Sequence, residues 1–182
     1  MKNLTENILN RETIKRSFLI IFWGDKMLMY SFSNKLFNPI LRTILRSPFR
    51  SLLPDNWVIL TYTGRKTHKK RSLVFHVAQY KDEFIVVPGC FGELPNWWRN
   101  FRKESRVHLF YKGKSMECLA RTIEHDETDA VPRLAAYVRI SHADQLGITA
   151  ETTEEKFNEL VTAAAKAYPI VTIRPHSSVS DS

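Results

Sequence analysis

Two segments of the 182-residue sequence carry side chains whose types and spacing suit ligand chemistry. The first is the loop at residues 63–71, Thr-Gly-Arg-Lys-Thr-His-Lys-Lys-Arg, which places five cations between two stretches with strand character. Gly64 permits a tight backbone, Thr67 adds a hydroxyl, and Arg and Lys heads grip phosphate oxygens through charge-assisted hydrogen bonds. The loop therefore predicts a site for a phosphate or polycarboxylate group. A merely solvated loop and a nucleic-acid contact stay open as alternatives, because nucleic acids carry the same phosphates.

The second segment, residues 88–101, reads Pro-Gly-Cys-Phe-Gly-Glu-Leu-Pro-Asn-Trp-Trp-Arg-Asn-Phe. Its two loop glycines let backbone approach a flat ligand, and the short helix expected after them presents free N–H groups at its start. Trp97, Trp98 and Phe101 are candidates for one wall of an aromatic slot. The same aromatics could instead plug the end of a barrel, and we expect at least one tryptophan to be core packing.

The elements that position these segments begin with a basic, amphipathic, helical extension over residues 1–56. Asn38-Pro39 opens one helix, with Asn as N-cap and Pro at the first helical position, and Ser47-Pro48 ends it. Apolar side chains line one side of this helix and arginines another. Such a helix can pack on the domain, cover a pocket or lie on anionic lipid. A peripheral membrane contact through residues 14–50 is therefore one alternative.

From residue 57 the pattern changes to short strands rich in β-branched and aromatic residues. Two helices are expected at about 127–141 and 153–167, the second opened by a capping box at Thr152–Glu155. The predicted fold is mainly β with helices (α+β): about six antiparallel strands in a closed or half-closed barrel over residues 57–175, followed by a disordered tail at 176–182. The expected strands are 58–63, 72–78, 84–87, 107–111, 116–121 and 170–173.

Bulk properties narrow the class of protein. The excess of 27 Lys and Arg over 19 Asp and Glu, a net charge of +8, favours anionic partners. Cys90 and Cys118 form no zinc-type spacing, so no metal site is predicted. The apolar run at 18–23 is far shorter than the roughly 20 residues of a membrane span, and no signal-peptide cleavage site follows it. A cytoplasmic protein is expected, with membrane association at the inner face as a variant.

Several of these segments together resemble the deazaflavin-dependent nitroreductase family. The likeness is carried by Leu60–Thr67 followed by Arg71, by the strand at 84–87, by the run at 97–102 and by the closing strand at 169–175. It covers about residues 36–124 well and the C-terminal end loosely.

The resemblance implies a split β-barrel that binds the reduced deazaflavin F420 and passes its hydride to a quinone, a nitro compound or another electron-poor acceptor. In it, Arg65, Lys66 and Thr67 would hold the cofactor phosphate. The further implied cofactor contacts are Arg71 beside that phosphate, Gly89, Cys90, Phe91 and Gly92 along the ring, and Trp98, Asn100 and Arg102 near the ring or its acidic tail. Split barrels frequently dimerise, so a homodimer is expected.

Departures from the family pattern are His68, where glycine is usual, and Lys70, where proline is frequent. The acceptor site lies outside the matched region, where Tyr137 is one candidate for a donor that stabilises charge on the acceptor. His76, His108 and the run Ser141–Asp144 are interpreted as ordinary strand and helix-end residues.

Two alternatives stay beside the F420 hypothesis. The first keeps the barrel and uses FMN. The second is a non-enzymatic basic module that binds nucleic acid or anionic membrane, although its cations cluster in one loop and one helix rather than along several strands, so that no nucleic-acid partner is expected.

Overall fold

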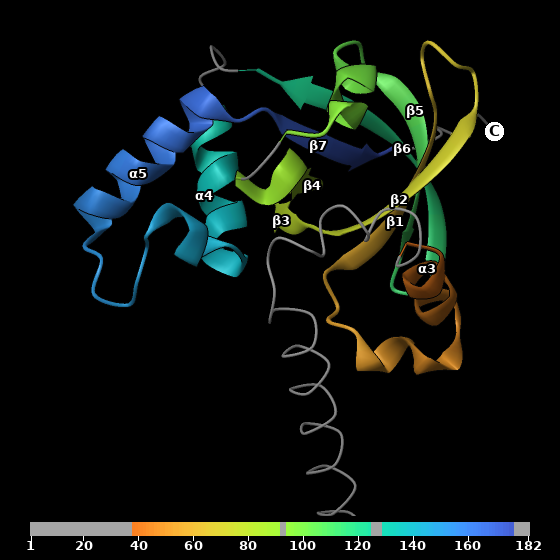
Figure 1. Cartoon of the computed structure of the whole chain (residues 1–182), viewed down its shortest axis with the longest axis horizontal. Helices are drawn as coiled ribbons and strands as arrows, with labels where there is room; N and C mark the ends of the chain where they lie inside the picture. Colours follow the sequence, from red (N-terminus) through yellow and green to blue (C-terminus); the bar gives the residue numbers. More distant parts are fainter. Residues whose placement is uncertain (1–37, 92–93, 125–128, 177–182) are drawn as a thin grey trace, which may run out of the picture.

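The computed structural model describes residues 38–91, 94–124 and 129–176. Its frame is one sheet of seven strands in the order β2-β1-β5-β6-β7-β4-β3, with every neighbouring pair antiparallel (Figure 1). The strands are β1 (Trp57–Thr63), β2 (Lys70–His76), β3 (Ala78–Tyr80), β4 (Glu83–Val86), β5 (Ser105–Tyr111), β6 (Lys114–Ile123) and β7 (Ile170–Pro175).

The predicted strand at 72–78 is in fact two strands. β2 ends at His76 and β3 begins at Ala78, yet the two lie at opposite ends of the strand order. Since only Val77 separates them, the sheet must curl until its two ends approach one another. Val77 is buried at this corner, and its N–H donates to the Asn56 carbonyl at 2.9 Å. The sheet is therefore a curled half-barrel, which confirms the predicted split-barrel α+β fold.

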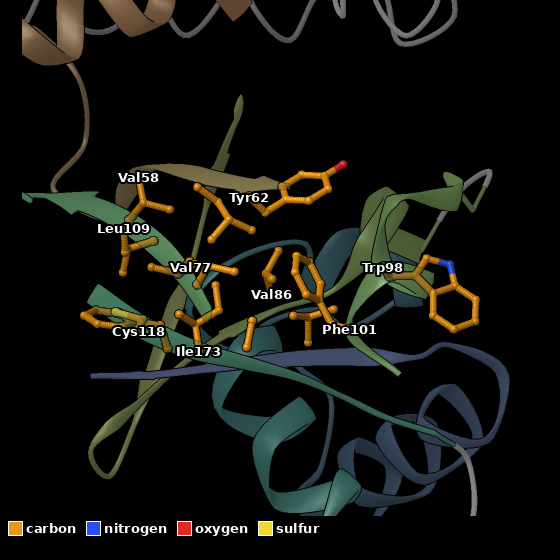
Figure 2. Packing of buried hydrophobic residues seen from close by; sticks show 14 residues of the cluster. Val58, Tyr62, Val77, Val86, Trp98, Phe101, Leu109, Cys118 and Ile173 are labelled. Carbon is orange, nitrogen blue, oxygen red and sulfur yellow. The ribbon is translucent and has the colours of Figure 1, made fainter. Parts of the chain in front are cut away.

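The inside of the curl is filled by apolar side chains from alternate strand positions. Val58, Leu60 and Tyr62 of β1 all belong to this cluster, as the period of two along a strand requires. Figure 2 shows Val58 and Tyr62 among residues from the other strands, with Trp98 at one end beyond Phe101. This core is the floor on which the candidate site is built.

Helices cover the outside of the sheet in two places (Figure 1). The helix α3 (Asn38–Arg46) packs Leu41 and Leu45 against Ile59 on the outer face of β1. The helices α4 (Ala130–Ile140) and α5 (Glu154–Ala167) share a second apolar cluster with β3 and β4. The remaining short 3-10 helices are η2 (Pro48–Leu52), η3 (Pro88–Phe91), η4 (Asn96–Phe101) and η5 (Ala143–Leu146).

The helix ends agree with the sequence in part. α3 ends at Arg46, directly before the predicted Ser47-Pro48 stop, and begins at Asn38 itself. The capping box predicted for α5 is wrong by one residue. Thr153 is the N-cap and its hydroxyl accepts from the Lys156 N–H at 3.3 Å, so that position N3 holds a lysine, which cannot return the second bond.

The remainder of the N-terminal extension, residues 1–37, and residues 177–182 of the predicted tail lie outside the described residues. Within the described part of the chain, no helix is long and apolar enough to cross a bilayer.

Candidate functional site

The β1–β2 loop closes on itself through its own backbone. The Gly64 N–H donates to the Lys69 carbonyl at 2.9 Å, and the His68 N–H donates to the Gly64 carbonyl at 2.8 Å. A Cβ added at Gly64 would lie 2.8 Å from the Thr67 hydroxyl oxygen, so a side chain here would require the Thr67 side chain to move. The loop is thereby a compact support for the exposed side chains of Arg65, Lys66 and Thr67.

Asn100 joins this loop to η4. Its Oδ1 accepts from the Arg65 N–H at 2.9 Å, and its Nδ2 donates to the Trp97 carbonyl at 2.7 Å. The two segments that the sequence marked separately, the basic loop and the aromatic run, are therefore parts of one site. The predicted role of Asn100 was a contact with the cofactor, and the structure adds this second role of fixing the loop.

Arg71 lies on a different face of the hairpin from its neighbours. It pairs across from Tyr62, whose side chain belongs to the inner core, whereas Lys70 and Ser72 border a hollow on the outer face. Burial raises the pKa of the Tyr62 phenol, and the positive charge of Arg71 offsets part of that rise. Guanidinium, ammonium, hydroxyl and a tight backbone turn are the donor set that binds phosphate, so the residues present fit the phosphate of a deazaflavin cofactor.

The aromatic wall divides into an anchored and a half-buried part. Phe101 and Trp98 are 1% and 7% exposed, which confirms that at least one tryptophan is core packing. Trp97 is half-buried, and its ring stacks on Phe75 with centroids 5.4 Å apart and planes 13° from parallel. The Phe75–Trp97 pair is therefore the part of the wall that can meet a flat ligand.

Trp98 and Arg102 fasten η4 to the sheet. Two guanidinium groups contact the Trp98 ring, Arg99 at 5.4 Å and Arg102 at 5.2 Å from its centroid. The Trp98 carbonyl accepts from the buried Thr122 hydroxyl at 2.9 Å, and Arg102 forms an ion pair with Glu124 at 2.8 Å. Both residues thus hold the wall in place, and their predicted contact with the cofactor stays a prediction.

Gly89 is required where it stands. Its φ is +76°, in the left-handed region, and a Cβ there would lie 3.2 Å from the Pro95 ring. The side chains of Cys90 and Phe91, and the whole of Gly92, lie outside the described residues, so the ring contacts predicted for this loop stay predictions.

A pair of histidines was missed by the sequence analysis. His76 at the end of β2 meets His142, which lies directly before η5, with 3.2 Å between their Nε2 atoms. Burial, and then the charge of His142, lower the pKa of His76 to about 4; burial also lowers the pKa of His142. Tyr137 is fully buried and stacks on His142 at 6.0 Å. No local feature of the sequence predicts this contact, because the two histidines are 66 positions apart.

Among the described residues, no three His, Cys, Asp or Glu side chains gather in a way that could hold a metal ion. The fold and the site define a class: a split β-barrel with a basic loop beside an aromatic wall. Residues 50–153, more than half of the chain, match the F420H(2)-dependent quinone reductase family, and the chain belongs to that family. It is an F420-dependent oxidoreductase, and the family implies F420 as its cofactor.

The solved structures that this chain resembles are more distant. The F420-H2 dependent reductase FDR-A shares 18% identity over 67% of this chain and 96% of its own, with a TM-score of 0.47. A protein described as a domain-swapped dimer shares 16% over 75% and 94% with a TM-score of 0.39. The heme storage protein HutZ from Vibrio cholerae shares 11% over 77% and 90% with a TM-score of 0.41. No curated protein matches the chain.

Proposed function

We propose that this chain transfers a hydride from reduced F420 to a quinone or a nitro compound, with the cofactor phosphate bound by the β1–β2 loop. The observation that carries the proposal is the bond from the Arg65 N–H to Asn100, because it places the phosphate-binding loop and the aromatic wall side by side. When bound, F420 supplies the hydride, and the protein supplies binding and orientation.

The residues then have separate tasks. Arg65 and Lys66 would bind the phosphate oxygens by charge, and Thr67 would donate a hydrogen bond from its hydroxyl. Arg71 would offset the negative charge of the phosphate from the inner face of the hairpin. Trp97 would cover one side of the flat ring and exclude water from it. Gly89 lets Leu94 and Pro95, further along the same segment, approach its backbone closely.

For the acceptor side, we propose that Tyr137 acts as a positioning residue. Its ring is fully buried and supports the half-buried His142, which is the better placed of the two to meet a molecule arriving from solvent. The acceptor class itself is tested by following F420H2 oxidation with a naphthoquinone and with an aromatic nitro compound. If neither compound oxidises F420H2, the proposed acceptors are wrong, and the family assignment is unaffected.

Cofactor binding is tested by titrating the protein with F420 and following fluorescence at low and moderate salt. Lys66→Ala removes one charged phosphate contact, so the affinity should fall about tenfold or more. Lys166→Ala, an exposed lysine in the last turn of α5, is the matched control and should leave the affinity unchanged. Equal affinities for the two variants would refute the assignment of the loop.

A peripheral contact with anionic lipid is proposed as well, on one specific observation. Ile40 and Phe49 are 52% and 67% exposed on α3 and η2, and Arg42, Arg46 and Arg50 lie in the same short stretch. The wild-type protein should float with phosphatidylglycerol vesicles and not with phosphatidylcholine vesicles, and Phe49→Ser should reduce flotation. Retained flotation of Phe49→Ser would contradict this contact.

The homodimer expected for this chain also stays a prediction. Sedimentation velocity of the full chain over a range of concentrations tests it directly.

A further inference from the structure

The hollow that Lys70 and Ser72 border lies on the outer face of the sheet, on the side away from the inner core. It is a groove of about 610 Å³ between α3 and the strands β1, β2, β5 and β6. Its lining includes Arg46, Thr61, Lys70, Ser72, His108 and Phe110. The family assignment gives no role to this groove.

The strand register places the polar lining residues in one row. Ser72, Thr61 and His108 are direct cross-strand partners on β2, β1 and β5, so their side chains project from the same face. The Thr61 and Ser72 hydroxyl oxygens are 2.9 Å apart and share a hydrogen bond. One hydroxyl proton of this pair stays available to a ligand, because only one is needed between the two oxygens.

The next row supplies an apolar floor. Ile59 and Phe110 are partners on β1 and β5, and both line the groove. The Arg46 guanidinium lies 5.8 Å from the centroid of the Phe110 ring, which holds this cation at the edge of the hollow. A ligand with a charged head and a short apolar part would match both rows.

The charge in the groove has one sign. Its lining contains Arg46 and Lys70 and no carboxylate. The nearest acidic partner in the register, Glu117 opposite His108, forms an ion pair with Arg106 at 3.3 Å and is thereby compensated. Two cations, an imidazole and a pair of hydroxyls facing one hollow attract an anion and offer it hydrogen-bond donors.

This groove is separate from the cofactor site. Along β2 the side chains alternate, so that Lys70 and Ser72 face the groove whereas Arg71 faces Tyr62 and the inner core. The exposed Arg65 and Lys66 belong to the loop beyond the strand ends and do not line the groove.

We propose that the groove is a second anion site, which binds the phosphate group of a phosphate ester between Arg46 and Lys70. The same chemistry is found in a small soluble ester and in a phospholipid headgroup, so the test has an arm for each source. The probes are sn-glycerol 3-phosphate and phosphatidylglycerol vesicles.

The soluble arm is a two-dimensional amide NMR titration of the full chain, first saturated with F420 so that the cofactor site is occupied. Glycerol phosphate should shift the amide signals of Thr61, Ser72 and His108. Arg46→Gln and Lys70→Gln should each weaken the binding about tenfold, since each removes a charged hydrogen bond to the anion. Lys166→Gln is the matched control and should titrate like the wild type.

The vesicle arm separates the two sources. Vesicle binding that depends on Arg46 and Lys70 and is displaced by glycerol phosphate identifies a headgroup as the ligand, and NMR shifts without vesicle binding identify a soluble ester. Both results support the site. Unchanged titration of the Arg46→Gln/Lys70→Gln double variant, or shifts confined to residues 64–67, would overturn it. If F420 does not bind, the proposed function fails by itself, and the titration without F420 still reports on the groove.

Discussion

Asn100 makes two hydrogen bonds of opposite direction through two different atoms of its amide. Its amide oxygen accepts from the Arg65 N–H while its amide nitrogen donates to the Trp97 carbonyl. A carboxylate provides only acceptors, and an aliphatic side chain provides neither group. Asparagine suits this position because one backbone segment supplies an N–H donor and the other a carbonyl acceptor.

Replacing Asn100 should weaken cofactor binding through the loop. Asn100→Ala removes both bonds and should lower the F420 affinity about tenfold, because the loop must then be ordered on binding. Asn100→Asp keeps the acceptor, loses the donor and adds a negative charge beside the β1–β2 loop. This variant should therefore bind F420 no more tightly than Asn100→Ala does. Asn158→Ala on the exposed side of α5 is the control in the fluorescence titration. Wild-type affinity in both Asn100 variants would contradict this role.

His68 has a backbone conformation in the left-handed region, which glycine adopts most easily. Its φ is +52°, and histidine tolerates the left-handed region better than β-branched residues do. His68→Val should therefore destabilise the fold by about 1–2 kcal/mol, and His68→Gly should cost less or be neutral. Urea unfolding followed by circular dichroism measures both. Equal stability of the Val and Gly variants would show that the loop does not hold this φ.

At the scale of elements, α3 depends on a small apolar cluster of its own. Leu41, Leu45, Leu53 and Ile59 are its buried members, and the cluster is separate from the two larger ones. A short helix has little stability without such packing. The position of α3, and with it the Arg46 wall of the outer groove, rests on these few contacts.

Leu45→Ala should loosen α3 more than it unfolds the barrel. Leu45 is 2% exposed, so its truncation should cost about 2–4 kcal/mol of local packing. Hydrogen exchange of the α3 amides should accelerate while that of β5 and β6 stays slow. Ile40→Ala, at a position 52% exposed, is the matched control and should leave exchange unchanged. Uniform acceleration in all elements would instead show that α3 unfolds only with the whole domain.

At the scale of the whole molecule, the contact between His76 and His142 joins strand β2 to the segment before η5. His76 ends the edge strand β2, and His142 precedes η5, which packs with α4 and α5. Trp57 contacts the His76 ring edge-to-face at 5.5 Å, and Gln145 lies 3.2 Å from Nδ1 of His142. Both imidazoles are neutral in the folded state over most of the physiological range.

The pair predicts a loss of stability in mild acid. Because the pKa of His76 is lowered to about 4, the unfolded chain binds a proton between about pH 6.5 and pH 4 that the folded chain does not. Stability is therefore full above about pH 6.5 and falls as pH decreases toward 4, by at most about 1.4 kcal/mol per pH unit for this group. The lowered pKa of His142 acts in the same direction, and the Asp144 charge offsets part of it.

Urea unfolding at several pH values measures this slope. His76→Gln should flatten the slope, whereas His108→Gln, at an exposed position on β5, should retain it. An unchanged slope in His76→Gln would assign the acid sensitivity to other groups.

Local signals in the sequence were sufficient for several features of this protein. Strand composition located the hairpins, and Ser47-Pro48 marked the end of α3. The cations of the 63–71 loop predict an anion site, which stays a prediction. These features depend on propensity, proline geometry and charge density, which act over a few residues. The family resemblance then led to F420, and the family match confirmed it.

Contacts between distant residues were decided only by the tertiary structure. The split of one predicted strand at Val77 depends on the curl of the whole sheet, and the bond from Arg65 to Asn100 joins residues 35 positions apart. The meeting of His76 with His142 and the burial of Tyr137 depend on how α4 packs. A period of two tells which residues share a face of a strand. It does not tell which strand lies beside it or what covers that face, because many pairings bury the same apolar side chains and only the complete packing selects among them.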